Sequence, residues 1–266
     1  MSTRWKPVVV VTAMMLVAAS CGGSSGSGSG GSSGGSSGGT LNVFAAASLT
    51  NAFGDLQKTY QQQHPGWKVT LNLQGSDQLA AQIEQRAPAD VFAAASPRYP
   101  EQLQGEKLLG RTTDFATNSL LLVTPRSNPA GIRTAADLEQ GDAKVVVADP
   151  AVPLGAYTED VLRNLGIDET RLNIVSKEQD AEAVLAKVTA GEADAGFVYV
   201  TDALSRKAKL QEIGFPAAAD ATATYPIGIV SDSKHTKAAQ QWIDLVKGPR
   251  GQAVLERLGF GAAPTG

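Results

Sequence analysis

The sequence has 266 residues, with 23 Lys and Arg against 26 Asp and Glu, so neither nucleic acid nor an anionic membrane surface is indicated as a partner. Its hydrophobic content of 42% is enough for one large domain or two of modest size. A single Cys excludes a disulfide within one chain, and with only two His we expect no Cys/His metal site.

The first 21 residues carry the pattern of an export signal. Arg4 and Lys6 precede an apolar run, Val8–Ala19, that is too short for a comfortable transmembrane span. Small residues then lead to Cys21, so residues 1–21 resemble a lipoprotein signal peptide whose cysteine is acylated after cleavage. An ordinary signal peptide with an incidental cysteine is the alternative. The first interpretation predicts an extracytoplasmic protein that is lipid-anchored to the outer face of the cell membrane.

Residues 22–40 are almost entirely Gly and Ser up to Thr40. Such a segment has no side chains with which to bury apolar surface, and it behaves as a flexible coil. We therefore expect it to be a tether between the membrane and a domain that begins at Leu41.

From Leu41 onward, apolar runs of strand length alternate with helical patterns, which is typical of α/β architecture. Strands are predicted at residues 41–44, 67–73, 91–94, 119–124, 144–148, 173–175, 195–200 and 224–230. Helices are predicted at residues 51–63, 78–86, 100–106, 134–138, 156–165, 180–190, 203–207, 237–247 and 249–258.

This order of elements fits two α/β lobes, each a mixed sheet flanked by helices. We assign residues 41–118 and 226–266 to lobe 1 and residues 119–225 to lobe 2. The apolar run at 119–124 is then a strand that crosses between the lobes. Two hinge crossings are expected, near Asn118–Leu122 and near Thr224–Ile229.

Four turns share one pattern, in which a strand end is followed by small or hydroxyl residues and then by a helix. Each helix start offers unpaired N–H donors and about half a positive charge. In open α/β sheets, ligands bind beyond the carboxyl ends of the strands, where such turns collect. Taken singly, a serine in such a turn is more often a helix cap than a ligand. The four turns are Ala47-Ser48, Gly75-Ser76, Leu154-Gly155 and Asp180-Ala181.

Five segments, spread in order over residues 41–260, resemble the molybdate-binding proteins of ABC transporters. That family has the two-lobe type II periplasmic-binding fold, and the resemblance therefore implies this fold for the chain. The segments are FAAASLTNAF, GSDQLAAQIEQRAPADVF, ADPAVPLGAY, GFVYVTDA and KGPRGQAVLERLGF.

The resemblance also implies a set of oxyanion-binding residues. The two serine ligands of the family fall on Ser48 and Ser76, each of which would donate through its hydroxyl and its backbone N–H. Backbone N–H groups would come from Leu154 and Ala181, and a phenol from Tyr199.

Two positions depart from the family's pattern. Leu154 stands where the family usually has Ala, although only its backbone is needed. Asp77 stands beside Ser76 in place of a Ser- and Thr-rich run, and we expect its side chain to point away from the ligand.

With these residues, we expect high-affinity extracytoplasmic capture of molybdate, and of tungstate, by closure of the two lobes. The resemblance implies delivery to a membrane permease with its cytoplasmic ATPase, by a monomer that is not an enzyme. It implies no cofactor and no bare metal cation, since the metal arrives as the oxyanion.

Other functions remain open at this point. Sulfate, phosphate or another tetrahedral oxyanion could use the same donors, and Asp77 is the one candidate acceptor for the proton of hydrogen phosphate. Ferric iron is disfavoured because Tyr199 has no adjacent tyrosine. An enzyme with Ser48 as nucleophile would need His64 or His235 as base, and no GxSxG motif is present. A structural surface lipoprotein would need none of these residues.

Overall fold

A computed structural model of the chain describes residues 38–216, 219 and 221–264. The predicted signal peptide, Cys21 and residues 22–37 of the predicted tether lie outside the described residues. The last residues of that segment, Gly39 and Thr40, already belong to the first strand, which begins two residues before Leu41. Over the described ranges, none of the helices has the length and apolar character needed to cross a membrane.

Among the described residues, ten strands form two sheets of five, and the predicted α/β class is confirmed. The first sheet has the order β2-β1-β3-β10-β4, with β1 parallel to β2 and β3, and β10 antiparallel to β3 and β4. Its strands are β1 (Gly39–Ala46), β2 (Trp67–Gln74), β3 (Val91–Ala93), β4 (Thr113–Asn118) and β10 (Ala223–Ile229).

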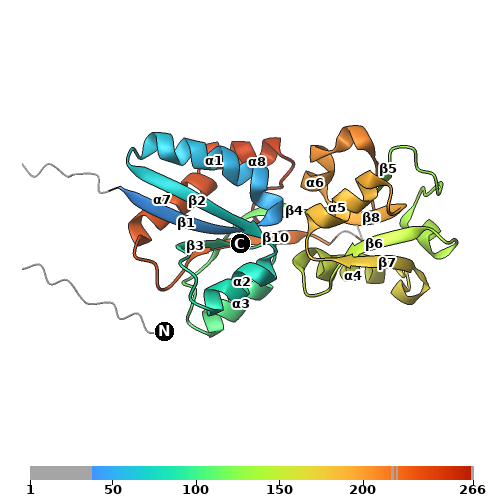
Figure 1. The fold of residues 1–266 in the computed structure, drawn as a ribbon, viewed down its shortest axis with the longest axis horizontal. Helices are drawn as coiled ribbons and strands as arrows, with labels where there is room; N and C mark the ends of the chain where they lie inside the picture. The colour runs from blue at the N-terminus through green and yellow to red at the C-terminus, as the bar shows by residue number, and fades with distance from the viewer. Residues whose placement is uncertain (1–37, 217–218, 220, 265–266) are drawn as a thin grey trace, which may run out of the picture. The chain divides into compact units, whose positions relative to one another are not determined.

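Helices cover both faces of this first sheet, with α1, α7 and α8 grouped on one side and α2 and α3 on the other (Figure 1). Such coverage explains why β1 reads as an almost continuous apolar run rather than as an alternating one. The helices are α1 (Thr50–Gln63), α2 (Ser76–Glu84), α3 (Arg98–Gly105), α7 (Thr236–Lys247) and α8 (Pro249–Arg257).

The second sheet has the order β7-β6-β8-β5-β9, in which β6 is parallel to β7 and β8, and β5 is antiparallel to β8 and β9. Helices α4 and α5 pack against β6 and β8, and α6 follows β8 directly. The strands are β5 (Leu120–Pro125), β6 (Lys144–Ala148), β7 (Asn173–Glu178), β8 (Ala195–Tyr199) and β9 (Leu210–Ile213). The helices are α4 (Pro153–Leu165), α5 (Ala181–Ala190) and α6 (Val200–Ser205), with short 3-10 turns η1 (Ala47–Leu49), η2 (Ala135–Glu139), η3 (Glu169–Arg171) and η4 (Lys207–Lys209).

The chain passes between the sheets first where it was expected, within Asn118–Leu122, and returns at a different place from the one expected. Only Ser119 separates β4 of the first sheet from β5 of the second. The run at 119–124 is therefore not a crossing strand, because β5 pairs along its length with β8 and β9. The second expected crossing, Thr224–Ile229, lies inside β10, which already pairs with β4 at Ala223. The sequence pattern missed β4 and β9, whose residues carry only weak strand signals.

The core of the first lobe is built around Trp242 of α7, which is fully buried. Its ring lies edge-on to Phe53 and Tyr60 of α1, with ring centroids 5.4 and 5.7 Å apart. Aromatic side chains bury large areas, and edge-to-face pairs add to that gain. Trp242 thus packs α7 against α1.

We predict that Trp242→Ala destabilises the fold by about 3–5 kcal/mol, because it removes buried contacts and leaves a cavity. Urea unfolding followed by circular dichroism measures this loss. Val175→Ala is the control, since Val175 is 47% exposed and its truncation should cost under about 0.5 kcal/mol. Equal losses in the two variants would show that Trp242 does not hold the helices together.

Helix α6 begins with a carboxyl group in an unfavourable environment. The Asp202 side chain accepts the N–H of Tyr199 at 3.3 Å, which closes the first turn of the helix. Burial raises the pKa of Asp202 to about 7, against the lowering effect of that hydrogen bond, and the charges of Glu182 and Asp180 raise the pKa further. The protonated form of Asp202 is therefore more favoured in the folded state than in the unfolded chain.

This preference predicts that stability falls as the pH rises. The pKa of Asp202 is about 7 in the folded protein, and its ordinary value is 3.8. The stability that the protonated side chain contributes is therefore lost as the pH rises from about 4 to about 7. The slope should approach about 1.4 kcal/mol per pH unit in that interval. Asp202→Asn keeps an acceptor for the Tyr199 N–H and should flatten the slope in urea unfolding series between pH 4 and pH 8. A slope that the variant leaves unchanged would rule Asp202 out as its source.

Candidate functional site

The four predicted turns follow parallel strands, at the edge of each sheet where helices begin. Strands β1 and β2 run into η1 and α2, and β6 and β8 run into the turns before α4 and α6. Helix α5 starts after β7, parallel to β6. Carboxyl ends of parallel strands share one edge of a sheet, so the turns of each sheet collect together.

A small cavity lies among these turns, and all five predicted ligand residues line it. The cavity is small, which suits a compact ion rather than an organic substrate. Residues of both sheets contribute to its wall. The lining consists of Ala46, Ala47, Ser48, Gln74, Gly75, Ser76, Ala95, Val152, Pro153, Leu154, Asp180, Ala181 and Tyr199.

Neither serine is a helix N-cap, in contrast to the expectation for Ser48. Residue Ser48 is the middle residue of η1, and its Oγ lies 3.0 Å from the Tyr225 hydroxyl. Residue Ser76 is the first residue of α2, is 1% exposed, and its Oγ accepts the N–H of Ala95 at 3.1 Å. Both hydroxyls are thus held in place by neighbouring groups, and both serines line the cavity.

Leu154 is the second residue of α4, so its N–H has no partner within the helix. Pro153 occupies the first position, where a missing N–H costs nothing. Gly155 follows because space is lacking, since a Cβ there would lie 2.1 Å from the Asp149 carbonyl oxygen. The absence of a side chain at Gly155 lets the first turn of α4 lie close to the backbone of Asp149, just after β6.

Ala181 is the first residue of α5 and is 6% exposed. The preceding Asp180 caps the helix, with its side chain accepting the N–H of Ala183 at 2.8 Å. That bond turns the carboxylate toward the helix, although Asp180 also lines the cavity. The cap satisfies the third N–H of the helix and leaves the Ala181 N–H as an available donor.

Tyr199 ends β8 and is 2% exposed. Its hydroxyl is buried and has no hydrogen-bond partner among the described residues. Burial, with the neighbouring Tyr225 as a second cause, raises the pKa of Tyr199 well above 10, so the phenol keeps its proton. A buried phenol without a partner costs free energy, which indicates that a ligand completes its hydrogen bonding.

The partial positive charge at this site comes from helix N-termini and not from cationic side chains. No Lys, Arg or His is among the described residues that line the cavity. Asp77 does not line the cavity, and its buried Oδ1 has no hydrogen-bond partner within the described part of the chain. Burial raises the pKa of Asp77, and the carboxylates of Asp149 and Asp180 raise it further.

The sequence did not indicate which residues form hydrogen bonds with the two serines. Ala95 donates its backbone N–H to Ser76, and Tyr225 contacts Ser48. Tyr225 precedes Pro226 at the entry of a strand, which marks an irregular strand end but does not indicate what the phenol contacts. A backbone donor such as that of Ala95 leaves no signal in the sequence.

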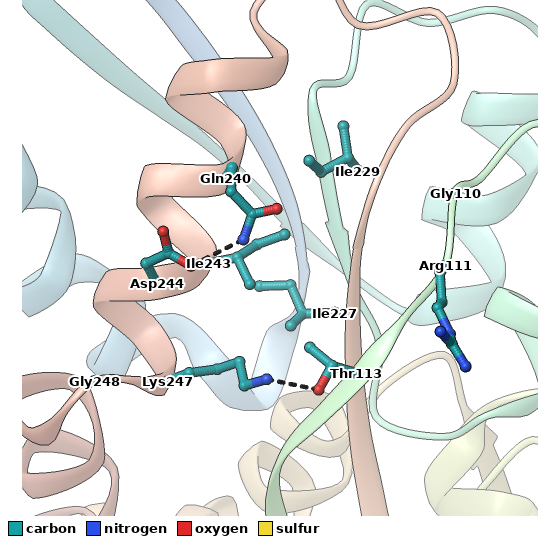
Figure 2. A pocket seen from close by; sticks show the side chains of 10 residues that line it. All are labelled: Gly110, Arg111, Thr113, Ile227, Ile229, Gln240, Ile243, Asp244, Lys247 and Gly248. Carbon is teal, nitrogen blue, oxygen red and sulfur yellow. Dashed lines mark hydrogen bonds between the residues drawn. The ribbon is translucent and has the colours of Figure 1, made fainter.

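A larger open pocket of about 480 Å³ lies between α7 and β10, away from the predicted residues (Figure 2). Its lining includes the apolar side chains of Ile227 and Ile243 and the cationic side chains of Arg111 and Lys247. Lys247 donates to Thr113 at 2.8 Å, and Gln240 donates to Asp244 at 2.8 Å. None of the five predicted ligand residues lines this pocket. Within residues 38–216, 219 and 221–264, no group of three or more His, Cys, Asp or Glu could hold a metal ion.

Known proteins resemble the chain over nearly its whole length. The molybdate-binding protein ModA of Mycobacterium tuberculosis is 36% identical over 252 residues, which cover 94% of this chain and 95% of that protein. The molybdate-binding protein ModA of Escherichia coli is 30% identical over 228 residues, covering 83% and 88%. The structure of the Azotobacter vinelandii periplasmic molybdate-binding protein matches with a TM-score of 0.74 at 22% identity, over 85% of this chain and all (100%) of that one, which shows a common fold.

Residues 41–261 match the family described as bacterial extracellular solute-binding protein. The match spans both sheets and every turn that lines the cavity. The chain belongs to the bacterial extracellular solute-binding proteins, and it is a homologue of the molybdate-binding protein ModA.

Proposed function

We propose that this protein captures molybdate outside the cytoplasm and delivers it to the membrane permease of an ABC transporter. One observation carries the proposal: all five predicted ligand residues line one small cavity, and no Lys, Arg or His is among its described lining residues. Several tetrahedral dianions would suit such a cavity, and the similarity to molybdate-binding ModA proteins favours molybdate.

Both lobes would contribute donors to the ion. Lobe 1 would offer the hydroxyls and backbone N–H groups of Ser48 and Ser76. Lobe 2 would offer the N–H groups of Leu154 and Ala181 and the Tyr199 phenol. Hydrogen bonds to a charged group contribute about 1.5–3 kcal/mol each, so seven of them outweigh the cost of immobilising the ion and closing the lobes.

Contacts near the cavity support binding by lobe closure. The Tyr99 hydroxyl of α3 donates to the Ala151 carbonyl before α4, and Gln78 donates to Gln179 at 3.3 Å. These bonds join the two lobes around the cavity. An ion that binds both lobes at once has its full set of donors only in the closed form, so it shifts the population toward that form.

The surroundings of Ser48 argue for a receptor without catalytic activity. Its Oγ contacts the Tyr225 phenol, whose pKa burial raises, so this partner is not a general base. No His is among the described residues that line the cavity. A serine nucleophile needs a base within hydrogen-bond reach.

The same donors would serve tungstate, which has the shape and charge of molybdate. The predicted acylation of Cys21 would hold the protein at the outer face of the membrane, and the Gly/Ser tether would let the domain reach the permease. A cytoplasmic ATPase would drive that permease, and the receptor would act as a monomer.

We predict that molybdate and tungstate raise the melting temperature. A ligand at a thousand times its Kd stabilises a protein by about 4 kcal/mol. For a protein of this size that corresponds to roughly 8–16 °C. Thermal unfolding with molybdate, tungstate, sulfate and phosphate in turn measures the effect. A shift with sulfate alone would indicate a sulfate receptor and overturn the proposal.

We further predict that the double variant Ser48→Ala, Ser76→Ala loses two charge-assisted donors and binds molybdate about 10²–10⁴-fold more weakly. Isothermal titration calorimetry measures this loss. Ser176→Ala is the matched control, because Ser176 lies on β7 outside the cavity and bonds to Glu178. Unchanged affinity in the double variant would move the binding site elsewhere.

A further inference from the structure

A chain of buried polar groups lies behind Ser48. Asn118, at the end of β4, is 2% exposed, and Tyr225 of β10 is fully buried. The Asn118 side-chain amide donates to the Tyr225 hydroxyl at 3.3 Å and to Thr201 Oγ1 at 2.9 Å. The Tyr225 hydroxyl then lies 3.0 Å from Ser48 Oγ. The network thus leads from the point where the chain crosses between the sheets to the wall of the cavity.

The direction of these hydrogen bonds is determined at Asn118. Its Oδ1 accepts the backbone N–H of Ser119 at 3.1 Å, so its NH₂ group must face Tyr225 and Thr201. An NH₂ group only donates, and the Tyr225 oxygen therefore accepts from it. Among the described residues, Ser48 Oγ is the one hydrogen-bond partner of this phenol that can accept, so the single phenol hydrogen is donated there.

With Tyr225 donating from behind, the hydrogen of Ser48 is left for the cavity. Ser76 is in the same situation, because the N–H of Ala95 donates to its Oγ. A serine hydroxyl can otherwise donate or accept. In this arrangement both serines act as donors toward the ion.

The Tyr225 ring is fixed tightly enough for this purpose. It lies edge-on to Phe260, Phe115 and Tyr199, with centroid distances of 5.4, 6.2 and 6.3 Å. The register of β10 against β4 shifts between Tyr225 and Pro226. Such bulges re-aim side chains next to functional sites.

We propose that Tyr225, oriented by Asn118, is a positioning residue that makes Ser48 a dedicated donor. Ser48 then presents its hydrogen to the ion, whose oxygens accept it. This inference rests on the proposed function, since it assigns a role in binding the same ion.

The test is a double-mutant cycle of Tyr225→Phe and Ser48→Ala, with molybdate affinity measured by calorimetry. Tyr225→Phe alone should weaken binding about three- to tenfold, because it removes one neutral hydrogen bond that orients a donor. In the Ser48→Ala background the same substitution should have less than a twofold effect. Tyr60→Phe is the matched control, because Tyr60 is also a fully buried lobe-1 tyrosine whose hydroxyl makes one bond, to the Ala238 carbonyl.

Asn118→Asp tests the direction of the network independently. A carboxylate only accepts, so Tyr225 would donate to it, and Ser48 would then donate to Tyr225 instead of to the ion. Binding should weaken more than in Tyr225→Phe. The added charge also repels the ion, but that part persists when Ser48 is replaced by Ala, whereas the directional part disappears. The loss should therefore shrink in that background.

The outcomes separate this inference from the proposed function. Wild-type protein that binds molybdate tightly, together with Tyr225→Phe that binds as tightly, would overturn the role of Tyr225 alone. An equal loss with and without Ser48 would show that Tyr225 acts through general structure, and would also overturn it. Wild-type protein that binds no oxyanion would overturn the proposed function, and the inference with it.

Discussion

The small cavity has to bind an anion through uncharged N–H and O–H donors, because no Lys, Arg or His is among its described lining residues, and the fold around it follows from that constraint. A doubly charged ion loses a large hydration free energy when it is buried. Without Lys or Arg in the wall, this loss has to be offset by many N–H and O–H groups at once. Helix starts supply such groups in fixed directions, because their first N–H groups have no partner within the helix.

The two sheets bring these helix starts together. Parallel strands β1, β2 and β3 in the first sheet, and β6, β7 and β8 in the second, each place their carboxyl ends at one edge. Small residues around the turns then allow close approach, as at Gly155, where any side chain would collide with the backbone of Asp149. Hydrogen bonds then orient the two serines. Tyr225, which accepts from Asn118, contacts Ser48, and the N–H of Ala95 donates to Ser76.

Acidic groups near the cavity show how local this recognition must be. Burial raises the pKa of Asp77 and Asp202, and other carboxylates nearby raise both further. A protein with a net charge of −3 gains no long-range attraction for anions, so the affinity has to come from donors in direct contact with the ion.

Sequence alone determined the α/β class, the order of most elements and the four turns, because each depends on local patterns of apolar, small and capping residues. The resemblance named five ligand residues, and the structure brings all five to one cavity, although their role as ligands stays a prediction. Tertiary structure alone decided that Ser48 bonds to Tyr225, 177 positions away, and that Ser119 is the single residue between β4 of the first sheet and β5 of the second. Strands β4 and β9 were missed since their residues carry little intrinsic preference and their pairing decides their conformation. Contacts between distant segments are set by how the sheets pack, and no spacing along the chain records them.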